Sequence, residues 1–146
     1  MRSDPFLHSL QTAAEGNNDS ADLNLYRNLA DLTPIPARSA NGPLGGPALQ
    51  PGATRLFTVS SVCGIPAVAV AVSVNITVVA GASGYFTLYS GTGINPGTSS
   101  LNFSAGQVRA NNAILLLSTD RIGGINVLNA SAGSNHFILD VNGYFR

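Results

Sequence analysis

The side chains that usually carry acid–base, nucleophilic or metal chemistry are scarce in this sequence. Two histidines, His8 and His136, and one cysteine, Cys63, occur in 146 residues. A structural zinc site needs four such ligands, and a nucleophilic triad needs a base that a third group orients. We therefore expect no catalytic site, no metal site and no cofactor.

Two glycine-rich stretches have the composition of functional loops but not their spacing. In GASG (81–84), predicted strands flank Ser83, whereas a nucleophile elbow leads from a strand into a helix. In GTGINPG (91–97), Pro96 stands where the dinucleotide-binding fingerprint requires its third glycine. We interpret both stretches as turns.

Asp140 lies inside a predicted strand, HFILDVNGYF (136–145). If its face of the strand is partly buried, the carboxylate needs a partner, and an arginine can bind it with two hydrogen bonds. Arg55 is the partner we predict, with Arg109 and Arg38 as alternatives. No second carboxylate forms a recognisable pair with Asp140, so a structural ion pair is favoured over a catalytic role.

Tyr85 and Tyr89 fall on one face of the predicted strand GYFTLYS (84–90), about 13 Å apart at the usual rise per residue. Two aromatic side chains in this arrangement can form a platform for sugar rings. The chain contains no tryptophan to extend the platform. A carbohydrate-binding module with a polysaccharide ligand is therefore an alternative function.

Charge is the property that most narrows the class of partner. Charged residues make up 10% of the chain, against roughly 25% in an ordinary soluble domain. Seven arginines and seven acidic residues leave a net charge of zero, so the chain lacks the positive field that nucleic acid or an anionic membrane requires. Low charge also leaves a surface poorly protected against self-association.

The sequence also shows neither a membrane-spanning helix nor a signal peptide. No run of about 18 apolar residues predicts a membrane-spanning helix, so we expect no membrane insertion. The first residues, MRSDPFLHSLQTAAEG, do not have the basic start and apolar core of a signal peptide.

From residue 53 onward, short apolar runs alternate with turn residues. This spacing is typical of an antiparallel two-sheet β-sandwich, either immunoglobulin-like or jelly-roll-like. The predicted strands cover residues 54–60, 67–79, 84–90, 100–103, 113–118, 125–129 and 136–145.

The stretch AVAVAVSVNITVV (67–79) has a period of two, with branched apolar residues at every even position from 68 to 78. The even face is predicted to be core. The odd face begins with Ala67, Ala69 and Ala71 and carries no charge, so another layer is expected to lie against it. That layer is a neighbouring subunit, the N-terminal arm of the same chain or its own second sheet. An ordinary central strand, buried on both sides within one sandwich, is at least as well supported as assembly.

The N-terminal part differs in composition from the sandwich. Residues 1–38 hold five of the seven acidic residues and no valine, and Leu25, Leu29 and Leu32 recur at helical spacing. We interpret 1–38 as a short helical or extended arm, 39–52 as a linker rich in proline and glycine, and 53–146 as the sandwich domain.

The chain contains the sequence blocks PGATR, VCGIPAVAVAVSVNITVV, GYFTLYSGTGINPGTSSLNF, GQVRANNAI and HFILDVNGYF. Together they resemble a known domain. From Gly42 to Arg146 the chain is similar to a glycine-rich all-β domain of large secreted or surface-attached bacterial proteins of largely unassigned function. In similar sequences a Cys-Arg pair and an Asp-Thr-Arg triplet precede the GPxGGP stretch, where this chain has TPIPARSANGP, so the expected partner of Cys63 is absent. The resemblance implies an extracellular or cell-surface setting and no catalysis.

These observations predict a non-enzymatic structural or adhesive module that self-associates into an oligomer or filament. The arm would dock on a sheet edge or on the alanine face of a neighbouring subunit, as in strand-complemented fibres.

Overall fold

The computed structural model describes residues 24–25, 35–36, 46–62 and 64–146, and these residues contain strands but no helix. The strands are short and are separated by glycine, serine and asparagine turns, as the alternating sequence pattern predicts. Their bounds are β1 Asn24–Leu25, β2 Ile35–Pro36, β3 Thr54–Thr58, β4 Ala71–Val79, β5 Gly84–Ser90, β6 Leu101–Phe103, β7 Val108–Leu116, β8 Gly124–Ser131 and β9 His136–Phe145.

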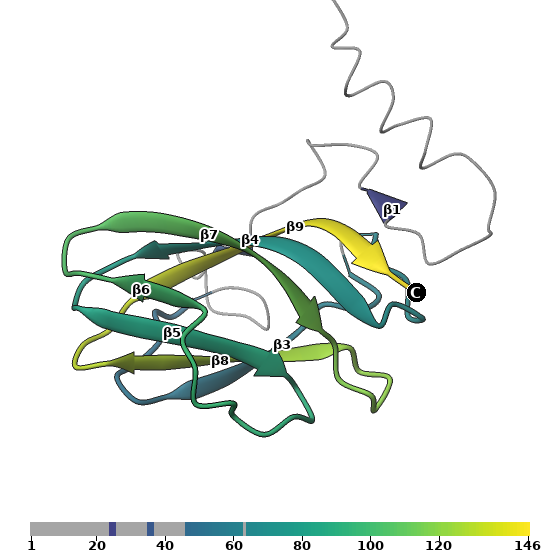
Figure 1. The fold of residues 1–146 in the computed structure, drawn as a ribbon, viewed down its shortest axis with the longest axis horizontal. Helices are drawn as coiled ribbons and strands as arrows, with labels where there is room; N and C mark the ends of the chain where they lie inside the picture. The colour runs from purple at the N-terminus through teal and green to yellow at the C-terminus, as the bar shows by residue number, and fades with distance from the viewer. Residues whose placement is uncertain (1–23, 26–34, 37–45, 63) are drawn as a thin grey trace, which may run out of the picture.

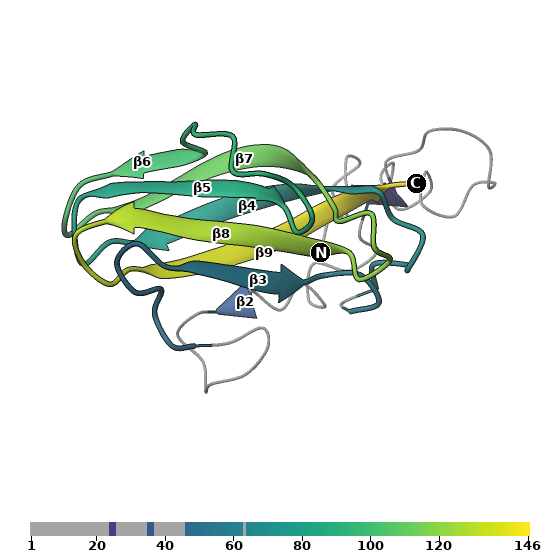
Figure 2. The ribbon, with the colours of Figure 1, turned by 90° about the horizontal axis from the view of Figure 1, so that it is seen from below.

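The strands form two antiparallel sheets that pack face to face (Figures 1 and 2). One sheet, called here the β4 sheet, has the order β1-β9-β4-β7, and β2 also pairs with β9. The other, the β5 sheet, has the order β3-β8-β5-β6. The predicted all-β sandwich is confirmed.

The core between the sheets is built from the inward residues of each strand. Phe137 on β9 lies edge-on to Phe57 of β3 and to Phe86 of β5, with ring centroids 5.0 and 5.9 Å away. Phe86 also contacts Phe103, at 4.8 Å. Edge-to-face contacts of this kind add stability beyond the area that the rings bury.

The valine strand confirms most of its predicted core face, with one correction. The four even positions within β4 are fully buried, as the period of two predicts; they are Val72, Val74, Ile76 and Val78. Val68 and Val70, however, are 66% and 56% exposed, so the prediction that they are core is wrong. The chain turns before β4 begins at Ala71, with the Ala69 N–H bonded to the Pro66 carbonyl, and this turn interrupts the alternation.

Other strand boundaries also differ from the prediction, most of all those of β3 and β7. β3 ends at Thr58, two residues early, because the N–H groups of Val59 and Ser60 both donate to the Gly123 carbonyl, which interrupts the regular ladder with β8. β7 begins at Val108, five residues before the predicted start, and its polar RANN segment pairs with β4 without interruption. The neighbouring strand supplies hydrogen bonds that outweigh the low strand propensity of asparagine.

Two short segments of the predicted arm lie along β9 of the same chain. Asn24 and Leu25 pair with Tyr144 and Gly143, and β2 pairs with residues 138–139 further along β9. The sequence predicted a neighbouring subunit as the target of the arm, whereas these segments cover an edge of their own sheet. Leu25, which the helical spacing placed on a helix with Leu29 and Leu32, lies in a strand instead, because it pairs with Gly143 of β9. Leu29 and Leu32 lie outside the described residues.

Part of the predicted linker is also built into the fold. Leu49 is buried and exchanges backbone hydrogen bonds with Asn135. The Asn129 amide group donates to the carbonyls of Leu49 and Gln50, at 2.8 and 3.2 Å. Residues 46–52 therefore belong to the sandwich rather than to a flexible connection.

Candidate functional site

The three alanines predicted as an assembly surface do not share one face. Ala67 is exposed in the turn before β4, whereas Ala69 packs into the core and Ala71 is buried between its neighbours on β7 and β9. The turn at residues 66–69 separates them, because the alternation holds only within a continuous strand. The outward residues of β4 at odd positions 73 to 79 are half-buried among the outward side chains of β7 and β9.

Tyr85 and Tyr89 lie on the outward face of β5, as predicted, but they do not form an open platform. Tyr85 is exposed and Tyr89 is half-buried. Thr87, between them, is buried, and its hydroxyl donates to the Thr98 carbonyl at 2.9 Å. The loop that follows β5 therefore occupies the space between the two rings.

Asp140 and Arg55 are not brought together. Asp140 lies on the outward face of the β4 sheet, where its carboxylate accepts a hydrogen bond of 3.4 Å from Asn75. Arg55 lies in the β5 sheet, where it donates to the Pro47 carbonyl at 3.3 Å and sits 4.7 Å from the Phe57 ring centroid. The sequence places both residues on strands, but strand order decides which strands are neighbours.

The described residues contain no cluster of three or more metal-ligating side chains. His136 lies opposite Val79 at the start of β9, while His8 and Cys63 lie outside the described part of the chain. No helix in the described ranges is long and apolar enough to cross a membrane.

Two buried asparagines form a polar network that the sequence reasoning missed. The Asn135 side chain accepts from the backbone N–H groups of Gly81 and Ala82, at 2.8 and 3.0 Å, and donates to Asn129 at 3.1 Å. Its second donor contact is to the Ser131 hydroxyl. Both asparagines are fully buried, so this network holds the turns at one end of the sandwich and is not a binding site.

The most unusual surface lies on β7, the outermost strand of the β4 sheet. Val108, Ile114 and Leu116 are 71%, 66% and 68% exposed. Val68 and Val70 add exposed apolar area just before β4, whose first residue pairs with Leu116. We call these five residues the apolar face. Large exposed apolar groups of this kind mark interaction sites on soluble proteins.

A local sequence signal for the apolar face exists in AILLL (113–117). Every residue in this run is apolar, so a strand there places apolar side chains on both of its faces. Leu115 and Leu117 point into the core, and Ile114 and Leu116 point outward. The sequence alone does not tell whether a second layer covers the outward side.

On one side of β7, no described strand pairs with the backbone N–H and C=O groups. At one end Ala80 N–H donates to Gln107 C=O, and at the other Leu117 N–H donates to Val70 C=O. Odd-numbered residues of β7 therefore direct their backbone groups to β4, and even-numbered residues direct their N–H and C=O groups to the opposite side. Among the described strands only β4 pairs with β7.

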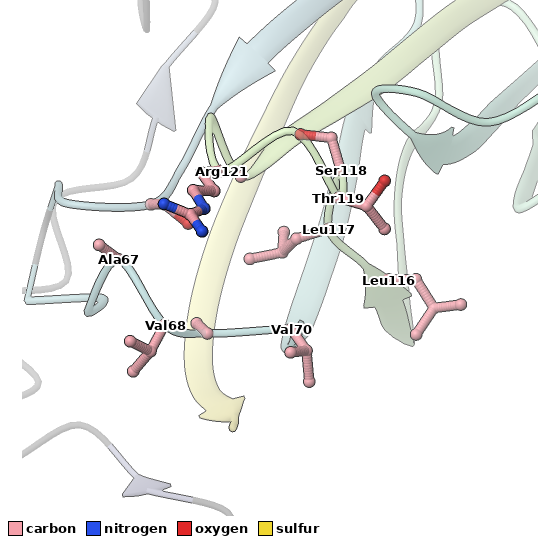
Figure 3. A pocket seen from close by; sticks show the side chains of 11 residues that line it. Ala67, Val68, Val70, Leu116, Leu117, Ser118, Thr119 and Arg121 are labelled. Atoms are coloured by element: carbon pink, nitrogen blue, oxygen red, sulfur yellow. The ribbon is translucent and has the colours of Figure 1, made fainter.

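A groove of about 400 Å³ continues the apolar face at the end of β7. Figure 3 shows Ala67, Val68 and Val70 on one side of it, Leu116 and Leu117 on the other, and Arg121 reaching over the same space.

The turn that carries Arg121 is held by Asp120. Its carboxylate accepts from the Ser118 hydroxyl at 2.5 Å and from Ile122 N–H at 3.0 Å. Both hydrogen bonds lower the pKa of Asp120, and the one from Ser118 has the larger effect.

Neither the family models nor the curated proteins with which the sequence was compared provide a match. The function is therefore inferred from the apolar face and the open edge of β7.

Proposed function

We propose that this chain is a non-enzymatic structural or adhesive module that self-associates through the apolar face, in an extracellular or cell-surface setting. One observation carries the proposal: Val108, Ile114 and Leu116 stand exposed on an outermost strand that has no neighbour beyond it among the described strands. Burying exposed apolar area against another chain is favourable by roughly 25 cal/mol per Å². The net charge of zero leaves little electrostatic repulsion between copies.

Two further observations support the setting and the role. The sequence blocks that resemble surface-attached bacterial domains support an extracellular or cell-surface setting. The exposed apolar side chains of the apolar face support an adhesive role, because contact with another surface removes them from water.

Self-association is tested by measuring the mass of the full chain with light scattering at tens of micromolar. We expect a species larger than a monomer, and a variant with Val108→Ser, Ile114→Ser and Leu116→Ser that dissociates at the same concentration. The matched control is Ile94→Ser, because Ile94 is 93% exposed in the loop after β5, outside the apolar face. A monomeric parent chain overturns the proposal.

Carbohydrate binding through Tyr85 and Tyr89 is a second candidate, because both lie on one face of β5. A sugar chain would have to contact the two rings on either side of the loop that Thr87 holds at Thr98. A panel of polysaccharides in affinity electrophoresis tests it. Retardation that the double variant Tyr85→Ala, Tyr89→Ala abolishes would support the candidate, and no retardation across the panel would remove it.

A further inference from the structure

Among the described strands, β7 is a long edge strand with a pairing partner on one side only. β6 pairs over three residues and β3 over five, whereas β7 runs for nine residues from Val108 to Leu116. Its ladder with β4 contains no register shift, so the edge is not distorted by a bulge. β7 contains no proline and one charged residue, Arg109. Bulges, prolines and charges are the devices with which natural edges avoid pairing with another strand, and β7 is poor in all three.

We propose that the β7 edge pairs with β7 of a second copy, antiparallel and about a two-fold axis at Asn112. The proposal rests on the proposed self-association and names its partner and its register. Asn112 is the midpoint of the strand, so this register pairs the whole of β7 with the whole of the partner strand. Two five-stranded sheets would then form one continuous sheet.

The backbone geometry suits this register. In an antiparallel pair, residues that lie directly opposite alternate between hydrogen-bonded and non-hydrogen-bonded pairs. The even-numbered residues of β7 direct both backbone groups to the open side. With Asn112 opposite its own copy, even residues meet even residues, so each becomes a hydrogen-bonded pair.

The side chains also match. Val108 lies opposite Leu116 of the partner subunit, and Ala110 lies opposite Ile114 of the partner subunit, all on the outward face. Such apolar cross-strand pairs stabilise an antiparallel sheet. The outward face of the joined sheet then carries one apolar surface that runs across both copies.

The charge distribution permits the same arrangement. Arg109 lies opposite the partner's Leu115, and the two arginines are about 20 Å apart along the strands at the usual rise per residue. Like charges placed directly opposite would destabilise the pair. A register centred on Asn112 avoids that contact, and the net charge of zero adds no repulsion.

Disulfide trapping tests the register in the full chain with Cys63→Ser as background. Asn112→Cys brings two Cα atoms to about 5.5 Å in a hydrogen-bonded pair, which is within disulfide range. Oxidation should therefore trap most of this variant as a dimer. Ala110→Cys should be trapped at least about tenfold less, since its two copies lie about 14 Å apart. A mixture of Ala110→Cys and Ile114→Cys should form the mixed dimer.

Proline substitution tests the hydrogen bonds themselves. Asn112→Pro removes an N–H that faces the open side and no hydrogen bond to β4, a position at which an edge strand tolerates proline. Because two hydrogen bonds at the centre of the pair are lost, the dimer dissociation constant should rise about tenfold or more. Asn112→Ala keeps the N–H and should associate as the parent does. Circular dichroism checks that each variant is folded.

The outcomes separate this inference from the proposed function. A parent chain that is monomeric by light scattering overturns both. An oligomeric parent with no Asn112→Cys dimer, or with Ala110→Cys trapped equally well, overturns the edge pairing alone. If Asn112→Pro does not fold, the disulfide result decides.

Discussion

In the β4 sheet, the outer sides of β9 and β7 differ in what pairs with them. Along β9, two segments from the N-terminal part of the chain add backbone pairs at residues 143–144 and 138–139. Along β7, nine residues present an open edge and three exposed branched side chains. An open edge invites another strand, so natural proteins cover it, distort it or charge it. Among the described residues, two segments pair with β9, and no strand pairs with the far side of β7.

The largest expected difference is in the free energy of unfolding, between a variant of an inward residue of β9 and a variant of an outward residue of β7. Phe137→Ala on β9 should lower the free energy of unfolding by about 3 to 5 kcal/mol, because Phe137 is fully buried against two other rings. Ile114→Ala on β7 should change it by less than about 0.5 kcal/mol. Urea unfolding at low protein concentration measures both, so that association does not contribute. Equal losses of stability in the two variants would contradict this prediction.

A second contrast compares two asparagines. Asn135→Ala should cost about 2 to 4 kcal/mol, since it leaves the N–H groups of Gly81 and Ala82 without their acceptor. Asn112→Ala, on the exposed part of β7, should be close to neutral in the monomer. Thermal unfolding of the two variants checks this. A stable Asn135→Ala protein would show that water replaces the network.

Removal of the covering segments should make the two edges alike. A chain that begins at Ser39 lacks β1 and β2, and we expect it to lose about 2 kcal/mol through the missing backbone pairs. It should also associate more strongly, because β9 becomes a second open edge. Light scattering against the full chain measures the change. Weaker association would instead show that the arm itself joins subunits.

A smaller effect is expected at Asp140, on the outward face between the two edges. Asp140→Ala should cost about 1 kcal/mol or less, because the described contact is a single long hydrogen bond from Asn75. A buried ion pair with Arg55 would have cost several times more. Chemical denaturation of the variant checks this, and a loss above about 3 kcal/mol would favour the ion pair after all.

The smallest effect concerns the turn after β7, where Asp120 accepts from Ser118 and Ile122. Its pKa is lower in the folded chain, so its ionised form stabilises the turn above the unfolded pKa, and this contribution is lost as the pH falls through the folded pKa. Amide chemical shifts of Ile122 and Gly124 should report that titration, and Asp120→Asn should remove it. An unchanged titration in the variant would assign it to another group.

The strands whose bounds sequence reasoning predicted best are β5 and β9. GYFTLYS and HFILDVNGYF appear with the predicted bounds, and their central inward residues are large and apolar at alternate positions. These residues are Phe86, Leu88, Phe137, Leu139 and Val141. RANN at the start of β7 was missed because its residues favour turns and its partner strand lies far away in the sequence. The exposed position of Val68 and Val70 was missed because a local turn interrupts an otherwise regular alternation.

The candidate site could be predicted only in part. Low charge and the apolar run AILLL indicate an adherent surface, but they do not tell which strand is outermost. The Asp140–Arg55 pair was predicted from chemistry alone, and the strand order places these residues in different sheets. The alanine stripe was predicted as one face, and the turn before β4 divides it.

The sequence by itself determined the all-β class, the alternating core positions and the scarcity of catalytic groups, because these follow from residue types and short-range periodicity. Only the tertiary structure decided that two N-terminal segments pair with β9 and that no described strand pairs with the far side of β7, because strand order depends on pairings between residues far apart in the chain. The same outward valine or leucine is core when another layer lies against it and an interface when none does. That distinction lies in long-range pairing rather than in local sequence.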